Sequence, residues 1–307
     1  MTMGGEFSMK AIIGMSGFNV LPLVFLLWSS AFAQRLPLRK PEFRIKTGQV
    51  DNIGRIDYDP KSGNYIFQWK GLDGKLKRAI YIPPWKAIVT VTAMVRQESK
   101  GFRYTYVLRN APNSPQAVNR FSLKMSSEPQ KVYVANNWEF WGISNSIFGK
   151  LANFSPYGRK QGFPLKPGSS LKIEFFSSFP PGVVKCYAFG DAPIMRVPEE
   201  MPGELADRLP KEEHLHGFTI APVEKPSLQR LVSDWDIAVE EGWVRDKKLA
   251  KRFSQDLQRI LRLFAEKRFE EAKAEAEQTI RFARQNQKLL EPEAQALIFF
   301  TLPHLVR

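Results

Sequence analysis

The feature that most restricts the fold of this chain is a change in the period of its apolar residues near Pro226. Up to about Phe218, apolar residues recur at every second position in short runs such as GNYIFQW, GFRYTYVLRN and SLKIEFF. Turn signals rich in Gly, Pro, Asn and Asp separate the runs, for example DPKSGN, GLDGK and FPPG. Short runs of this kind, without helical periods between them, predict an antiparallel β-sandwich. The longer NAPNSP is predicted to be a loop that crosses the end of the sandwich.

From Pro226 the apolar spacing becomes helical. Three stripes with spacings of three and four residues begin, in order, at Leu228, Leu249 and Phe269. Ser227 is a candidate N-cap of the first helix and Gly242 its stop, while Pro292 occupies the position expected for the first residue of a fourth, shorter helix. Each stripe can be buried only against its neighbours, which predicts a small helical bundle of about 80 residues.

The predicted fold class is therefore mainly β plus α, with an antiparallel β-sandwich followed by a small C-terminal helical bundle. We place the sandwich domain at residues 34–222 and the bundle at 223–307. An acidic, proline-bearing linker at about 196–214 separates the last strands and need not pack against either part.

The N-terminus has the pattern of a signal peptide. Lys10 precedes a short apolar run, and the small residues around Ala33 match a cleavage site that would leave Gln34 first. The alternative, a membrane anchor, is disfavoured because the apolar run is shorter than the roughly 20 residues needed to span a bilayer. We expect residues 1–33 to be removed. The mature protein would then be periplasmic or extracellular and would have no membrane span.

The amino-acid composition gives the protein a strong positive net charge. The 307 residues are 43% hydrophobic and 25% charged, an ordinary balance for a globular protein, and their net charge is +14. Residues 34–225 hold 29 basic and 17 acidic side chains, whereas residues 226–307 hold 15 and 13. The positive field is therefore expected on the β part. It favours an anionic partner, although a solvated basic surface without a partner would have the same composition.

Cys186 is the single cysteine, so no intrachain disulfide can form. It lies in the strand-like run GVVKCYAFG and is expected to be buried and inert.

The helical tail resembles the FIMAH type of module found at the C-terminal end of secreted bacterial proteins. The similarity lies in the order of helices across LVSDWDIAVEEGWVRDKKLAKRFSQDLQRILRLFAEKRFEEAKAEAEQTI and LLEPEAQALI, about a quarter of the chain. The resemblance implies an accessory part without catalytic residues. The β half is similar to uncharacterised secreted sandwich proteins through YTYVLRNAPNSPQAVNRFSL and LKPGSSLKIEFFSSFPPGVVKCYAFG, which implies location and fold and no activity.

Three tryptophans are candidates for ligand binding. In NNWEFWGIS, Trp138 and Phe140 share one face of a strand and Trp141 takes the other, so the two tryptophans cannot form one flat platform unless a bulge intervenes. Core packing of Phe140 and at least one tryptophan is the competing interpretation. Trp85, which follows Ile-Pro-Pro, is expected at a rim.

Four residues are candidates for metal binding. His214 and His216 would lie on one side of a strand, a spacing that can share a metal ion, but no further ligand is evident. Asp57 and Asp59 begin an oxygen-rich segment similar to a cation loop, although Lys61 occupies the third ligand position and a hairpin turn explains the same composition. No cofactor is expected.

These observations favour an exported protein of the cell envelope that binds without catalysis. Its basic β-sandwich would contact an anionic polysaccharide, another glycan or an envelope protein, and no specific recognition of nucleic acid is expected. A secreted hydrolase acting on glycan or peptide, with the helices as an accessory module, is the alternative. The motifs G-x-S-x-G, H-E-x-x-H and the P-loop are absent from the sequence. A purely structural role is a third possibility.

Overall fold

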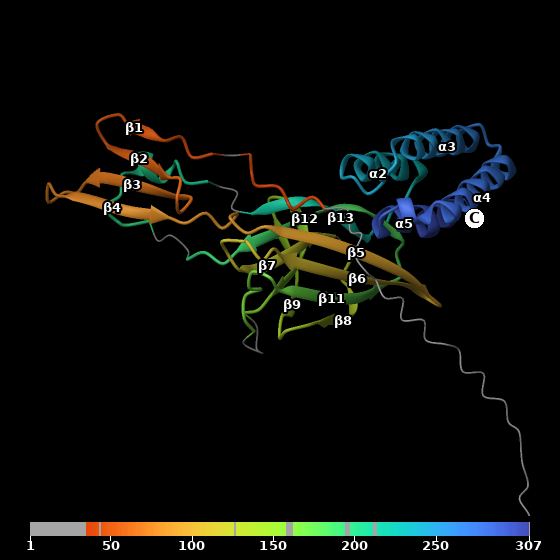
Figure 1. The fold of residues 1–307 in the computed structure, drawn as a ribbon, viewed down its shortest axis with the longest axis horizontal. Helices are drawn as coiled ribbons and strands as arrows, with labels where there is room; N and C mark the ends of the chain where they lie inside the picture. The colour runs from red at the N-terminus through yellow and green to blue at the C-terminus, as the bar shows by residue number, and fades with distance from the viewer. Residues whose placement is uncertain are drawn as a thin grey trace, which may run out of the picture. The chain divides into compact units, whose positions relative to one another are not determined.

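The computed structural model describes residues 35–42, 44–125, 127–157, 162–193, 197–210 and 214–306. The predicted signal peptide and its cleavage site at Ala33 and Gln34 lie outside the described residues. The fold is mainly β plus α, with three antiparallel sheets followed by helices at the C-terminal end (Figure 1). The predicted fold class is confirmed.

The first sheet is a meander of four strands paired in chain order. These are β1 (Gly48–Val50), β2 (Gly54–Asp59), β3 (Asn64–Lys70) and β4 (Leu76–Tyr81). Phe67 and Trp69 occupy its buried face, as the period of two requires. These strands were predicted to belong to the sandwich, whereas they form a sheet of their own. Short hairpins pair consecutive strands in this way.

Two further sheets make the sandwich. One has the order β13–β12–β7–β10–β9 and the other the order β5–β6–β11–β8. Their bounds are β5 (Val89–Glu98), β6 (Gly101–Asn110), β7 (Val118–Lys124), β8 (Gln130–Val134), β9 (Glu139–Ser146), β10 (Gly149–Ser155), β11 (Ser170–Ser177), β12 (Pro181–Gly190) and β13 (Leu215–Pro222). Tyr106 of β6 reaches across, with its ring centroid 6.5 Å from that of Phe121 and its hydroxyl donating to the Ile220 carbonyl. The NAPNSP loop joins β6 to β7 in the opposite sheet, so the predicted crossing is confirmed.

The segment between β12 and β13 packs, although the sequence did not require it to. It contains the short helix α1 (Gly203–Ala206), and both Met201 and Leu205 are buried. A Cβ atom placed on Gly54 would lie 2.7 Å from Leu205 Cδ1, so Leu205 lies directly against β2 of the first sheet. Ala206 and Leu209 of the same segment are partly buried and also pack against the core, so several apolar side chains hold it there.

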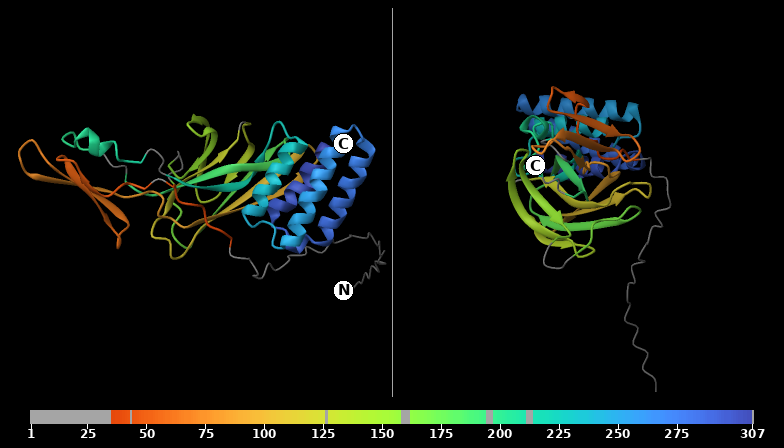
Figure 2. Two further views of the ribbon diagram at one scale, coloured as in Figure 1. Left: turned by 90° about the horizontal axis from the view of Figure 1, so that it is seen from above. Right: turned by 90° about the vertical axis from the view of Figure 1, so that its left-hand side faces the viewer.

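Helices follow from residue 228. Their bounds are α2 (Leu228–Glu240), α3 (Lys247–Ala265), α4 (Phe269–Gln285), the 3₁₀ turn η1 (Gln287–Leu289), α5 (Pro292–Ala296), the π turn η2 (Leu297–Thr301) and α6 (Leu302–Leu305). The Ser227 hydroxyl accepts from the Arg230 N–H, Gly242 has φ +72° just after α2, and Pro292 is the first residue of α5. These three predictions are confirmed. Helices α2, α3 and α4 lie side by side (Figure 2).

The helices share a core with the sheets. The Glu293 carboxylate of α5 accepts from the Ala93 N–H of β5 at 2.6 Å and forms an ion pair with Arg35. The Thr301 hydroxyl donates to the Pro181 carbonyl of β12. Among the described residues, no helix is both long and apolar enough to cross a membrane.

Candidate anion-binding groove

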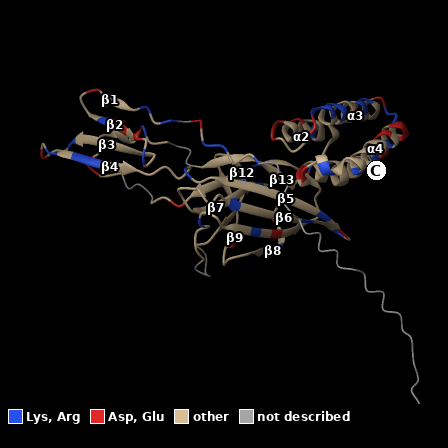
Figure 3. Cartoon of the chain, viewed as in Figure 1, with Lys and Arg blue, Asp and Glu red and all other residues tan. Residues whose placement is uncertain are grey.

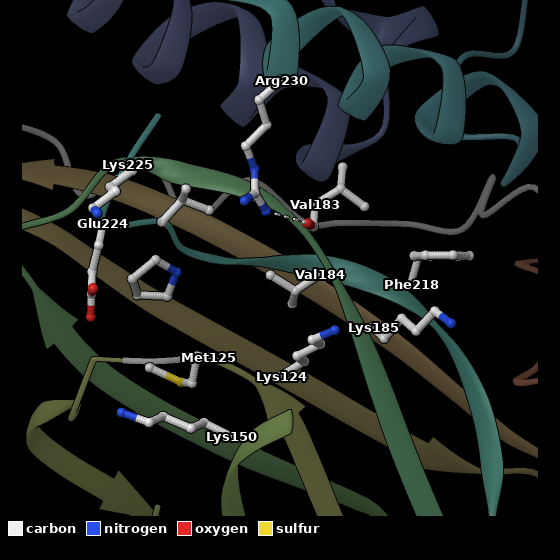
Figure 4. A pocket seen from close by; sticks show the side chains of 12 residues that line it. Lys124, Met125, Lys150, Val183, Val184, Lys185, Phe218, Glu224, Lys225 and Arg230 are labelled. Atoms are coloured by element: carbon white, nitrogen blue, oxygen red, sulfur yellow. Dashed lines mark hydrogen bonds between the residues drawn. The ribbon is translucent and has the colours of Figure 1, made fainter. Parts of the chain in front are cut away.

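A groove of about 530 Å³ lies over the five-stranded sheet, where α2 approaches β12 (Figure 4). We call it the basic groove. Strands β7, β10, β12 and β13, the β13–α2 connection and α2 all contribute to its lining. The lining residues are Lys124, Met125, Lys150, Val183, Val184, Lys185, Phe218, Pro222, Val223, Glu224, Lys225 and Arg230. Its size is that of an ordinary small-molecule or oligomer subsite.

Strand β12 places one lysine on the side of the sheet that lines the groove. Lys185 is the exposed residue between buried Val184 and buried Cys186. Cys186 pairs with Leu123 of β7, so the next residues along the two strands, Lys185 and Lys124, lie together on the outer face. Like charges at neighbouring cross-strand positions repel each other. An anion between them would remove that repulsion.

Helix α2 supplies the opposite wall through its first turn. Arg230 donates to the Val183 carbonyl at 3.1 Å and lies 3.6 Å from the Asp234 carboxylate. Asp234 in turn accepts from the Val183 N–H at 2.9 Å. Gly182 permits this close approach, because a Cβ there would lie 2.6 Å from Val223 Cγ2 and 2.9 Å from Asp234 Oδ2. The arginine is therefore held in a fixed place above the strand.

The charge of the groove is strongly positive and largely uncompensated. Four lysines and one arginine line it against a single carboxylate, that of Glu224. Within the part of the chain that the structure describes, Lys124, Lys150, Lys185 and Lys225 form no ion pair, and only Arg230 does. Buried apolar side chains such as Val183 and Val223 form the base between them. Several cations that line one groove beside apolar side chains raise the local positive potential and attract anions.

The predicted tryptophan candidates separate in space. Trp138 is buried and donates its Nε1–H to the Phe163 carbonyl at 2.9 Å, whereas Trp141 is 58% exposed on edge strand β9. These two residues therefore do not form one exposed platform, and Phe140 is half-buried against Phe154. Trp85 is mostly buried and lines a different hollow, near the first sheet.

The predicted metal candidates have other partners. His214 is buried among aromatic rings, with centroids 4.6 Å from Phe148 and 4.9 Å from Tyr187, and the rings of His214 and His216 are 6.5 Å apart. No group of three or more His, Cys, Asp or Glu side chains suited to a metal ion occurs among the described residues.

The two aspartates at the β2–β3 hairpin serve its structure. Asp57 pairs with Arg55 at 2.7 Å, and Asp59 accepts from the Lys61 N–H and the Ser62 hydroxyl. These hydrogen bonds lower the pKa of Asp59, the one from Ser62 most. Asp59 therefore closes a hairpin turn, as the competing interpretation of the sequence expected.

Cys186 is fully buried, and burial raises the pKa of its thiol far above the ordinary value. A thiol held in its neutral form is a poor nucleophile. The expectation that Cys186 is buried is confirmed.

Neither the basic groove nor a second charged surface, on α3, was predicted from the sequence. Lys185 is the one charged residue in VVKCYAF, a signal that could have pointed to the groove, but the partner lysines come from other strands. Helix α3 carries exposed basic residues along one side, whereas α4 begins with acidic residues (Figure 3). The exposed basic residues of α3 are Lys247, Lys248, Lys251, Arg252, Arg259 and Arg262. The counts of basic and acidic residues in residues 226–307 are nearly equal, so they do not reveal that basic residues gather on α3 and acidic residues at the start of α4.

No family model matches the chain, and no curated protein is significantly similar to it. The FIMAH-like resemblance of the helical tail therefore stays a prediction.

Proposed function

We propose that this protein is exported and binds an anionic polymer of the cell envelope through the basic groove. The observation that carries the proposal is that five cations line one groove beside buried apolar side chains, and that four of these cations form no ion pair with any described residue. A chain of acidic sugars fits these properties, since its carboxylates or sulfates can meet the cations while the sugar rings lie on the floor.

The helices are part of this proposal. Arg230 of α2 forms one wall of the groove, and the contacts of Asp234 with β12 hold that wall in place. A helical module with an accessory role, as the FIMAH resemblance implies, would act here by bracing the binding surface. The protein would then bind its partner without transforming it.

A double charge reversal tests the proposal. Lys124→Glu with Lys185→Glu places two negative charges in the basic groove and is expected to weaken binding to polygalacturonate by about tenfold or more, because each charge contact contributes on the order of 1 kcal/mol. Binding can be measured by calorimetry or biolayer interferometry, and unfolding curves show whether the variant is folded.

The matched control reverses two exposed lysines outside the groove. Lys248→Glu with Lys251→Glu on α3 makes the same change in net charge and is expected to alter the affinity less than about threefold. Equal losses in both variants would mean that net charge, and not the groove, governs binding, and the proposal would be wrong.

The hydrolase alternative requires two carboxylates, or a histidine with an acid, converging on one cleft. Among the described residues that line the basic groove, Glu224 is the single one with a carboxylate. The geometry therefore favours binding as the function of this site.

A further inference from the structure

A second hollow, of about 600 Å³, lies beside the first sheet. The β2–β3 hairpin, the segments 40–41 and 44–47, the turn after β4 and Pro115 form its walls. Its lining combines three aromatic side chains with four cations, and no carboxylate belongs to the lining among the described residues. We call it the aromatic hollow, defined by Tyr58, Tyr65, Trp85, Lys40, Arg44, Lys61 and Lys86.

The strand register builds the aromatic part. Tyr58 pairs with Tyr65 across β2 and β3, and Tyr65 pairs with Tyr81 across β3 and β4. Neighbouring ring centroids are 5.1 Å apart for Tyr58 and Tyr65 and 6.3 Å for Tyr65 and Tyr81, and Trp85 continues the row 6.0 Å from Tyr81. Tyr58 is 49% exposed, whereas Tyr65 and Trp85 are 9% and 8% exposed. The row therefore presents one accessible ring, supported from behind.

One cation is held in place beside this ring. The Lys86 ammonium donates to the Ser62 carbonyl at 2.9 Å and to the Asn64 side-chain oxygen at 2.8 Å. Neither acceptor carries a charge, so the ammonium keeps its full positive charge without a counter-ion. Partial burial of this ammonium lowers the pKa of Lys86.

The other cations are also unneutralised. Among the described residues, Lys40, Arg44 and Lys61 form no ion pair, and Arg44 lines the hollow together with Tyr65. Burial raises the pKa of the Tyr65 phenol, and the positive charge of Arg44 offsets only part of that rise. The carboxylate nearest to Lys61 in sequence, that of Asp59, is occupied by the turn, and Glu42, which lies between Lys40 and Arg44 in sequence, does not line the hollow. A guanidinium is suited to bind a carboxylate or sulfate through two parallel hydrogen bonds.

We infer that the aromatic hollow is a second binding site, which takes a single acidic sugar unit. The sugar ring lies on the exposed face of Tyr58, and its carboxylate or sulfate contacts Arg44 and the ammonium of Lys86. Binding of single-stranded nucleic acid fits less well, because it uses several exposed aromatic faces for successive bases. The site is separate from the basic groove, so the inference does not depend on the proposed function.

Titration of the ¹⁵N-labelled mature protein with trigalacturonate tests the inference site by site. The amides of Ser62 and Gly63 report on the aromatic hollow, and those of Val183 and Val184 report on the basic groove. Tyr58→Ala and Arg44→Gln should each weaken the binding seen at Ser62 and Gly63 by about tenfold. The Lys124→Glu, Lys185→Glu variant should leave that binding unchanged.

Three results would overturn the inference. The first is saturation at Ser62 and Gly63 that neither Tyr58→Ala nor Arg44→Gln changes by twofold. The second is equal or tighter binding there of hexaglutamate or of an oligo-dT hexamer, which would show a peptide or nucleic-acid site instead. The third is equal binding of the methyl-esterified trisaccharide, which would show that the cations are not used. If the Val183 and Val184 amides do not respond to the titration but those of Ser62 and Gly63 do, the proposed function is contradicted and this inference is not affected.

Discussion

Asp234 is the residue that most directly joins the helices to the basic groove. Its carboxylate is buried, accepts from the Val183 N–H and lies beside Arg230. Burial raises its pKa above the ordinary value of 3.8, and the hydrogen bond and the arginine only partly offset this effect. The folded state therefore holds this proton to a higher pH than the unfolded state does.

A pH dependence of stability follows from that shift. The contribution of Asp234 to the free energy of unfolding is greatest below the pKa that this group has in the unfolded state. It is lost as the pH rises through the pKa of the group in the folded state. Asp234→Asn cannot titrate, so its free energy of unfolding, relative to the wild type, should increase between pH 4 and pH 7. Urea unfolding of both proteins across this range measures the difference. A difference that stays constant with pH would contradict the assignment.

Helix α1 is the element whose packing is most open to a direct test. Leu205→Ala should lower the free energy of unfolding by about 2–3 kcal/mol, because it removes a fully buried side chain that contacts the first sheet. Leu72→Ala changes a leucine that is 97% exposed and should cost less than about 0.5 kcal/mol. Equal effects of the two changes on urea unfolding would mean that α1 does not pack as described.

At the scale of helices and strands, some features could be predicted from the sequence and others could not. The boundaries of α2 and α5 were predictable because Ser227, Gly242 and Pro292 act on their own backbone neighbours. The sequence did not predict the separation of β1–β4 from the sandwich or the burial of Leu205. Both features depend on contacts between residues that are far apart in the sequence. The same limit applies to the candidate sites: Trp138 is fixed by the Phe163 carbonyl, and the basic groove is assembled from four strands and a helix.

At the scale of the whole molecule, one buried ion pair ties residues near the N-terminal end of the described chain to the closing helices. Arg35 pairs with Glu293, whose carboxylate is fully buried and also accepts from Ala93 of β5. Arg35→Ala should lower the free energy of unfolding by about 3 kcal/mol, since it leaves a buried carboxylate without its cation. The double variant with Glu293→Leu should recover part of that loss. A single variant as stable as the wild type in thermal and urea unfolding would contradict this role.

We propose that the lysines lining the basic groove bind an anionic polymer by charge. The affinity of the protein for polygalacturonate as a function of salt concentration tests this proposal most directly. Affinity should fall steeply with salt, and the slope of log affinity against log salt should decrease by about two in Lys124→Ala, Lys185→Ala but not in Lys248→Ala, Lys251→Ala. A slope that is the same in all three proteins, or an affinity that ignores salt, would contradict the account.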